Sequence, residues 1–229
     1  MSMLNDFIEL FFPEVCECCG NLLYRNEHTL CTRCRMHLPR TNFHLHPDNP
    51  VAAIFWGRVN FQYATSFLYF ARAGRVQHLM HRFKYKGRRD IGLLLGGLFA
   101  RELRRSENFS NIDMIIPVPL HWSKQKKRGY NQSEVISYAM APLLNAHLVT
   151  EVLYRNSATE TQTKKSRSLR AENVKGKFSI QYPEKIRGKH LLLIDDIITT
   201  GATIEACAQT LLTVDQVKVS IASLAYAGK

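Results

Sequence analysis

The sequence predicts an α/β protein with a doubly wound, mostly parallel sheet, preceded by a small cysteine-rich module. Two observations predict the sheet. Apolar runs of strand length alternate with segments of helical periodicity after about residue 54, as in folds whose helices cover a parallel sheet. The run Leu191–Ile194 is wholly apolar, which is typical of a strand buried on both faces. The module is predicted because five of the six cysteines lie between positions 16 and 34.

The N-terminal part is expected to begin with a short amphipathic helix over residues 1–12, which Pro13 ends. The cysteine module follows at 16–38. Residues 39–50 are rich in proline and short polar residues and predict a loop. We therefore place a domain boundary there, with the helix and cysteine module in 1–50 and the α/β domain in 51–229. Within that domain, 51–105 is a leading segment and 106–229 is the core.

The elements of the α/β domain follow from the hydrophobic period. Helices are predicted at 76–83, 91–103, 133–144 and 203–212. Strands are predicted at 112–118, 148–154, 191–194 and 217–225, and one or two more within 54–71, where aromatic and β-branched residues mix. Residues 159–177 are polar and basic without periodicity, so we expect a mobile loop there.

The charge balance favours anionic ligands. The net charge is +12, from 31 Lys and Arg against 19 Asp and Glu, which attracts nucleotides, pyrophosphate, nucleic acid or anionic surfaces but does not distinguish among them. No apolar run has the length of a membrane span; Ile91–Ala100 is too short and contains three glycines. The first residues lack the pattern of a signal peptide, so we expect a cytoplasmic protein.

The cysteines form two pairs with Cys-x-x-Cys spacing, separated by about a dozen residues. Four thiolates at this spacing suit a closed, tetrahedral, structural Zn²⁺ site, and a module this small would be folded largely by the metal. Cys18 is surplus, and unligated cysteines or an iron–sulfur site are the alternatives. Nearby arginines are compatible with nucleic-acid binding without establishing it. The predicted zinc ligands are Cys16, Cys19, Cys31 and Cys34.

The segment Leu191–Thr203 carries the strongest chemical signal. Two carboxylates follow the apolar strand, at the sheet edge where α/β proteins bind ligands. The run Thr199-Thr-Gly-Ala-Thr203 then opens a helix, and its backbone amides and hydroxyl groups suit a phosphate monoester. Carboxylates accept hydrogen bonds from sugar hydroxyl groups. The segment thus predicts a ribose 5-phosphate site, whereas an ordinary strand–turn–helix is the alternative.

This segment resembles the phosphoribosyl-pyrophosphate (PRPP) motif of type I phosphoribosyltransferases. Three further features are similar to the ComF family, bacterial competence-associated proteins with a phosphoribosyltransferase domain. They are Ile116-Pro-Val-Pro-Leu-His-Trp122 with Lys127-Arg-Gly-Tyr-Asn-Gln132, the pattern Gln162, Arg167, Arg170, Asn173 and Phe178, and the cysteine module. The resemblance covers nearly the whole chain and implies a sheet of the type I phosphoribosyltransferase kind.

The resemblance also implies roles for individual residues. Asp195 and Asp196 would hold the ribose hydroxyl groups and, with Arg128, form the catalytic set. The 5′-phosphate would be bound by Thr199, Thr200, Gly201, Ala202 and Thr203. The pyrophosphate would be bound by Pro117, Val118, Pro119, Arg128, Gly129, Asn131 and Gln132. A loop closing over PRPP would contain Gln162, Arg167, Arg170 and Asn173, although plain disorder is an equal alternative there. Lys84 and Lys86 are weaker candidates, and Mg²⁺ is expected with PRPP.

Two functions fit these features. The first is a Mg²⁺-dependent enzyme that transfers phosphoribosyl from PRPP to a nitrogen acceptor and releases pyrophosphate, in a competence or DNA-uptake context. The second is a non-catalytic module that senses a nucleotide or PRPP and binds single-stranded DNA or a DNA-uptake partner. The sequence contains no recognisable motif for a nucleobase, and it predicts neither the acceptor nor the oligomeric state.

Overall fold

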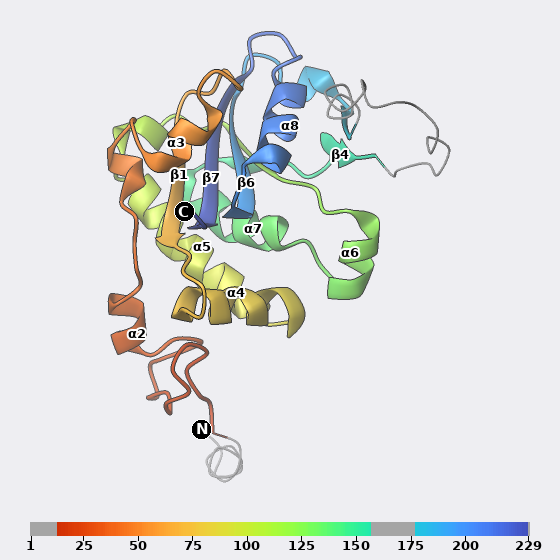
Figure 1. Ribbon diagram of the computed structural model, residues 1–229. Helices are drawn as coiled ribbons and strands as arrows, with labels where there is room; N and C mark the ends of the chain where they lie inside the picture. Colours follow the sequence, from red (N-terminus) through yellow and green to blue (C-terminus); the bar gives the residue numbers. More distant parts are fainter. Residues whose placement is uncertain (1–12, 157–176, 229) are drawn as a thin grey trace.

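The computed structural model describes residues 13–156 and 177–228. Its central sheet contains five parallel strands in the order β1-β7-β6-β2-β3 (Figure 1). These are β1 (Ala64–Tyr69), β2 (Met114–Pro117), β3 (His147–Leu148), β6 (His190–Ile198) and β7 (Lys218–Tyr226). A separate antiparallel pair joins β4 (Leu153–Arg155) to β5 (Phe178–Ile180). The mostly parallel sheet is therefore confirmed.

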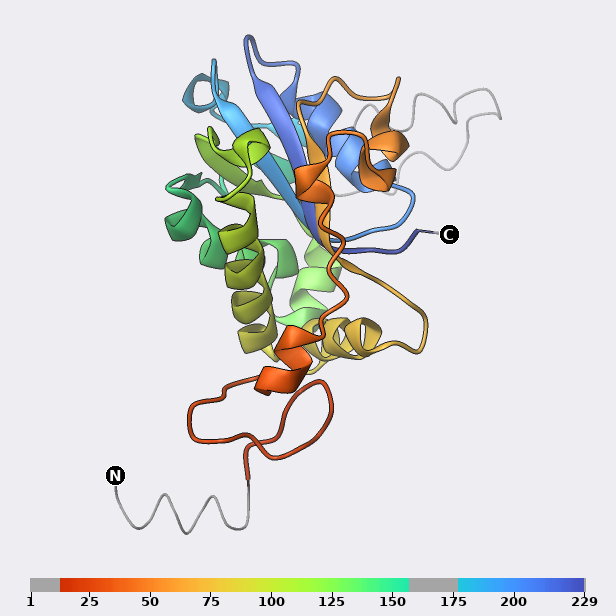
Figure 2. The same ribbon diagram turned by 90° about the vertical axis from the view of Figure 1, so that its left-hand side faces the viewer.

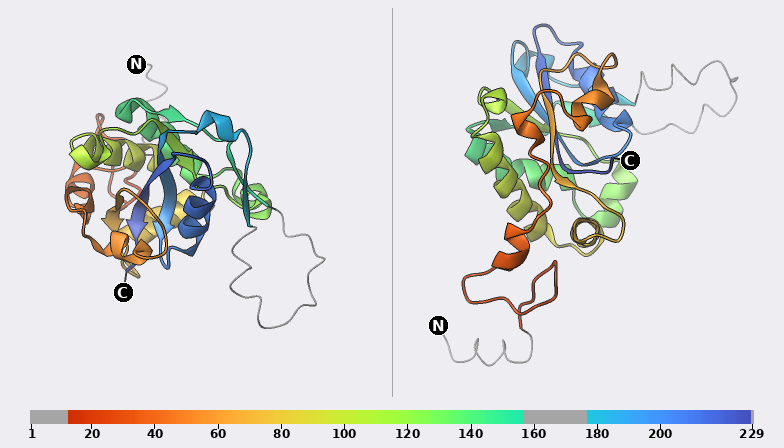
Figure 3. Two further views of the ribbon diagram at one scale, coloured as in Figure 1. Left: turned by 90° about the horizontal axis from the view of Figure 1, so that it is seen from above. Right: turned by 60° about the vertical axis from the view of Figure 1, so that its left-hand side comes forward.

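Helices cover both faces of the sheet (Figures 2 and 3). One face packs against α5 (Arg89–Leu103) and α7 (Gln132–Leu144), and the other against α3 (Pro50–Phe55) and α8 (Ala202–Leu211). The apolar strand β6 serves both layers, because Leu192 and Ile194 belong to the first core and Leu191 and Leu193 to the second. Because successive side chains point to opposite faces and helices cover both faces, every residue of such a strand is apolar.

Four short elements and two further helices complete the described chain. The short ones are α2 (Thr32–Met36), η1 (Phe43–Leu45), η2 (Glu107–Phe109) and η5 (Pro183–Lys185). Helix α4 (Arg75–Tyr85) lies beyond the carboxyl ends of the strands, between the sheet and the cysteine module, while α6 (Trp122–Arg128) projects at one side (Figure 1). Among the described residues, we find no helix with the length and apolar character needed to cross a membrane.

The structure decides between one and two strands over 54–71, and it divides one predicted strand. The segment 54–71 contains one strand, β1, preceded by α3, because the Asn49 side chain accepts hydrogen bonds from the amides of Val51 and Ala52 and Pro50 occupies the first turn. The segment 148–154 is divided: two residues pair with β2, and the chain then leaves the sheet to pair with β5. The other predicted helices and strands between residues 76 and 225 are confirmed to within a few residues.

Two sequence predictions lie outside the described residues: the helix over residues 1–12 and nearly all of the loop over 159–177. The domain boundary near residue 50 stays a prediction. Polar contacts do cross it, since the Thr41 hydroxyl donates to the Ser66 carbonyl, and residue 40 forms an isolated bridge with Leu68 of β1.

Candidate functional site

The acid pair lies inside β6, before its last two residues, rather than in the turn after it. The strand continues beyond these residues because Asp195, Ile197 and Ile198 stay paired with β7. The Asp195 Oδ1 accepts hydrogen bonds from the Ser133 hydroxyl, at 3.1 Å, and from the Asp196 amide, at 2.8 Å. Ser133 belongs to the first turn of α7, so that helix and β6 meet at the carboxylate.

The second carboxylate is paired with a lysine from the leading segment. Lys84 Nζ of α4 lies 2.9 Å from Asp196 Oδ1. The side chains of Lys84 and Asp196 keep 17% and 13% of their surface exposed, so a ligand can reach the pair. Lys84 was only a weak candidate by sequence, and the structure brings it into contact with Asp196.

The electrostatics of the pair are dominated by burial. The pKa of Asp195 is raised to about 7, chiefly by burial and also by the neighbouring Asp196 charge. The hydrogen bond from the Asp196 amide, the charge of Lys84 and the hydrogen bond from Ser133 act in the opposite direction on that pKa. Asp195 therefore gains or loses its proton near neutral pH.

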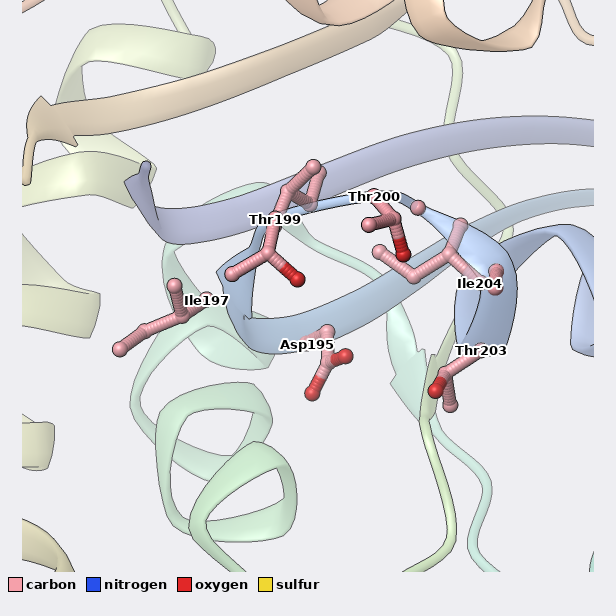
Figure 4. Close-up of a pocket in the computed structure, with 9 residues that line it drawn as sticks. Asp195, Ile197, Thr199, Thr200, Thr203 and Ile204 are labelled. Atoms are coloured by element: carbon pink, nitrogen blue, oxygen red, sulfur yellow. The ribbon is translucent and has the colours of Figure 1, made fainter. Parts of the chain in front are cut away.

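A hollow of about 50 Å³ follows the acid pair (Figure 4). It is lined by Asp195 and the continuous run from Ile197 to Ile204. A water molecule needs roughly 10–15 Å³ of such space, so the hollow accepts a group larger than water. The Thr199, Thr200 and Thr203 side chains and the Asp195 carboxylate surround one space, and their hydroxyl groups bond to none of the described residues.

Gly201 makes this turn possible for two reasons. Its φ is +76°, in the left-handed region that glycine adopts without strain. A Cβ atom at this position would lie 2.6 Å from Ile54 Cγ2 and 2.9 Å from Phe55 Cε1. Helix α3 therefore packs directly against the turn at Gly201. Ala202 then begins α8, whose first amides have no intrahelical partner and point toward the turn.

The residues predicted to bind pyrophosphate form a second edge of the site. Pro117 ends β2 beside Ile194 of β6, and the Val118 amide donates to the Ile194 carbonyl. The Asn131 side chain donates to the Val118 carbonyl at 3.1 Å and also caps α7. The turn after β2 and the start of α7 are thus joined next to the acid pair.

Arg128 is held by contacts from two helices. Its guanidinium donates to Gln132 Oε1 at 2.7 Å and lies 5.2 Å from the centre of the Tyr85 ring. Gly129 adopts a φ of +78° and ends α6, which lets the chain turn back into α7. Tyr85 and Ser133 were not predicted by the sequence analysis. Their only signal is position, beside Lys84 and directly after Gln132, respectively.

Of the remaining predicted candidates, the structure describes Lys86 and Pro119. Lys86 is exposed and away from the acid pair's contacts. Gln162, Arg167, Arg170 and Asn173 lie outside the described residues. Pro119 follows Val118 and is half-buried.

The cysteine module gathers four sulfur atoms. The Sγ atoms of Cys16, Cys19, Cys31 and Cys34 all lie within 4.8 Å of one another, an arrangement that can hold a metal ion. The Cys31 amide donates to Cys16 Sγ at 3.3 Å. Burial and the adjacent thiols raise the pKa of Cys34, a cost that a bound cation removes. Cys18 is not one of the four, although its thiol contacts that of Cys34.

Comparison with known proteins then places the chain. Residues 131–229 match the phosphoribosyl transferase domain family. The DNA utilization protein YhgH of Shigella flexneri is 31% identical over 201 residues, which are 86% of this chain and 84% of that protein. The chain belongs to the ComF family. Competence protein F of Haemophilus influenzae is 31% identical over 147 residues, covering 62% of this chain and 64% of that protein.

Among solved structures, the glutamine PRPP amidotransferase from B. subtilis aligns with a TM-score of 0.42 and 20% identity, over 62% of this chain and 30% of that chain. The domain match and the sheet confirm the type I phosphoribosyltransferase fold class for this ComF family member. The matched domain contains the acid pair and the threonine turn. Pro117, Arg128 and the four clustered cysteines of the N-terminal module precede it.

Proposed function

We propose that this ComF family member binds PRPP with Mg²⁺ and transfers the phosphoribosyl group to a nitrogen acceptor, with release of pyrophosphate. The observation that carries the proposal is local. One continuous segment surrounds a single hollow with a carboxylate, three threonine hydroxyl groups and the first turn of a helix. Hydrogen-bond donors for a phosphate beside acceptors for a sugar diol match the two ends of a ribose 5-phosphate.

The 5′-phosphate is bound by the amides and hydroxyl groups of residues 199–203. The left-handed backbone at Gly201 turns these donors toward the hollow. Asp195 and Asp196 orient the ribose through its two hydroxyl groups. Because Lys84 already neutralises Asp196, the diol meets a pair with one compensated charge and not two bare carboxylates.

The pyrophosphate lies toward the turn after β2 and the start of α7. Residues 117–119 form the wall of this edge, Gly129, Asn131 and Gln132 lie at its other side, and Arg128 supplies a planar set of donors suited to phosphate oxygens. Gln132 and Tyr85 hold Arg128 in place, which lowers the entropy lost when a ligand binds.

In the transfer step, a nitrogen lone pair attacks C1 of the ribose while the bond from C1 to the pyrophosphate oxygen breaks. Negative charge develops on the leaving oxygen, and Arg128 stabilises it. Positive charge develops on the ribose ring, and the acid pair stabilises it. Positioning and charge compensation account for most of the catalysis, since no covalent intermediate is required.

Two metals belong to the proposal. The four cysteines offer an all-sulfur set within 4.8 Å of one another, which suits a structural Zn²⁺. Mg²⁺ would be held by the PRPP phosphates and carboxylates, and it would supply charge neutralisation of the leaving pyrophosphate. We place the function in the cytoplasm, where thiols stay reduced and can bind metal.

A second candidate function is favoured by α6. This helix has the sequence Trp-Ser-Lys-Gln-Lys-Lys-Arg, contains no acidic residue and buries none of its side chains. Trp122 is 62% exposed. Exposed aromatic and cationic side chains together suit single-stranded nucleic acid. The names of the YhgH and competence relatives agree with a role in DNA handling. In this alternative, PRPP or a nucleotide is sensed and not consumed.

The test is binding followed by turnover. Calorimetry with PRPP and Mg²⁺ is expected to detect binding by the wild-type chain and none by the Asp195→Asn, Asp196→Asn double variant. Asp215→Asn changes an exposed carboxylate outside the site and should bind normally. Pyrophosphate release is then measured across a panel of nitrogen bases. Binding without release for any base would reject the enzyme and leave the sensing module.

A further inference from the structure

Helix α4 contacts two different sites with two neighbouring basic residues. Arg82 forms an ion pair with Glu17 of the cysteine module, and Lys84 pairs with Asp196 of the acid pair. Residues two apart on a helix differ by about 200° around its axis, so they point in nearly opposite directions. Figure 1 shows α4 between the cysteine module and the carboxyl ends of the strands.

Glu17 is the centre of the first contact. It lies between Cys16 and Cys18 in the chain, and only 1% of its side-chain surface is exposed. Its carboxylate pairs with Arg82 and also with Arg88, directly before α5. A buried carboxylate is tolerated only when it is paired, so this contact fixes where the module meets α4.

Further contacts make the junction rigid. Arg88 binds Asp90 at 2.7 Å, and Asp90 accepts a hydrogen bond from the Thr29 hydroxyl of the cysteine module at 2.9 Å. Apolar residues of the module and of α4 belong to one core, in which Leu30 joins Leu79 and Phe83. The module therefore contacts α4 through the buried Glu17–Arg82 ion pair and a shared apolar core, and it contacts the start of α5 through Arg88 and Asp90.

We propose that Glu17 is a positioning residue for the acid pair: through Arg82 and Arg88 it fixes α4, and α4 holds Lys84 against Asp196. The cysteine module is thus coupled to the sugar-phosphate site at the other side of the helix. The part of this inference that concerns PRPP affinity rests on the proposed function. The part that concerns the Lys84–Asp196 contact does not.

The same arrangement links metal binding at the four cysteines to the Lys84–Asp196 contact. Cys16 and Cys19 flank Glu17 closely, so a metal ion on the four sulfur atoms would fix the backbone that carries this carboxylate. Loss of the metal frees Glu17, and α4 loses its buried anchor. The distal effect is loosening of Lys84, and Asp196 then remains as an uncompensated charge beside Asp195.

The experiment compares Glu17→Gln with Glu151→Gln. Both replace a carboxylate by an amide, but Glu151 forms an exposed pair with Lys185 outside the junction and the site. The first readout is the protonation midpoint of Asp195, followed by carbon NMR without ligand. Lys84 lowers the pKa of Asp195, so its displacement raises the midpoint above about 7. The other groups that face Asp195, namely Asp196, Ser133 and Cys207, are unchanged in both variants.

The expected result is a higher midpoint in Glu17→Gln and in Lys84→Met, with Glu151→Gln at the wild-type value. PRPP affinity is measured in parallel and should fall at least about fivefold in Glu17→Gln, the lower limit of typical coupling between sites. Metal content is measured for each variant. Arg82→Gln leaves the module's own residues intact and should reproduce both effects if Glu17→Gln does not fold.

An unchanged midpoint and affinity in Glu17→Gln and Arg82→Gln would overturn the coupling. An unchanged midpoint in Lys84→Met would overturn it too, because Lys84 would then not act on the pair. If the wild-type chain fails to bind PRPP, the proposed function is rejected, and the ligand-free midpoints still decide whether Glu17 positions the acid pair.

Discussion

Replacing Gly201 by alanine tests whether the threonine turn needs both the backbone conformation of this residue and its close contact with α3. The left-handed φ of +76° costs a residue with a Cβ about 1–2 kcal/mol. The new Cβ would also lie 2.6 Å from Ile54 and 2.9 Å from Phe55, and overpacking of this kind costs about 1–3 kcal/mol. The free energy of unfolding should therefore fall by about 2–5 kcal/mol.

Gly57 provides the matched control. Its φ is +70°, but no atom lies within 4 Å of an added Cβ. Gly57→Ala should show the conformational cost alone, about 1–2 kcal/mol. The two variants are compared by urea unfolding with metal in excess, and by the melting temperature, which falls by about 2–4 °C per kcal/mol in a chain of this size. Equal destabilisation of both variants would refute the claim that α3 supports the turn.

Three further predictions concern charge, metal and nucleic acid. The folded-state pKa of Asp195 is raised, chiefly by burial, from 3.8 to about 7, so the folded protein binds more protons than the unfolded chain in this interval. This residue therefore makes the free energy of unfolding fall as pH rises from about 4 to about 7. Urea unfolding of Asp195→Asn across that pH range should lack this part of the decrease. Elemental analysis should find about one metal ion per wild-type chain, with a clear loss in Cys19→Ser and none in Cys18→Ser, which lies outside the sulfur cluster. If α6 binds single-stranded DNA, Lys126→Ala should reduce the slope of log affinity against log salt by about 0.7, and Trp122→Ala should weaken binding by about 1–3 kcal/mol.

Each of these has an outcome that contradicts it. A pH–stability curve of Asp195→Asn that parallels the wild type would show that Asp195 titrates normally. Retention of metal in Cys19→Ser together with its loss in Cys18→Ser would reverse the ligand assignment. An undiminished salt slope in Lys126→Ala, measured over several salt concentrations, would remove α6 from any DNA surface.

Features encoded by neighbouring residues could be predicted from the sequence. The segment 191–203 is one strand, one turn and one helix start, and its chemistry is set by residues that are adjacent in the chain. The two Cys-x-x-Cys pairs are local in the same sense, and their four sulfur atoms do gather. Local spacing suffices in such cases because backbone geometry leaves few alternatives.

The segment over 54–71 shows where local reasoning left the number of strands open. Its apolar and aromatic residues suit a strand as well as a buried helix, and period alone does not separate the two for short runs. Asn49 favours the helix α3 before the single strand β1. Its side-chain oxygen caps α3, and its side-chain amide donates to the carbonyl of Ala64, 15 residues later.

The sequence by itself therefore determined the fold class, the threonine turn that follows the acid pair, and the cysteine cluster, since each depends on contiguous residues or a short repeat. Only the tertiary structure decided that Lys84 meets Asp196, 112 residues away, that Glu17 meets Arg82, and that α3 lies beneath Gly201. Contacts between distant residues depend on how whole helices pack, and a single charged side chain carries no sign in the sequence of which partner it will meet.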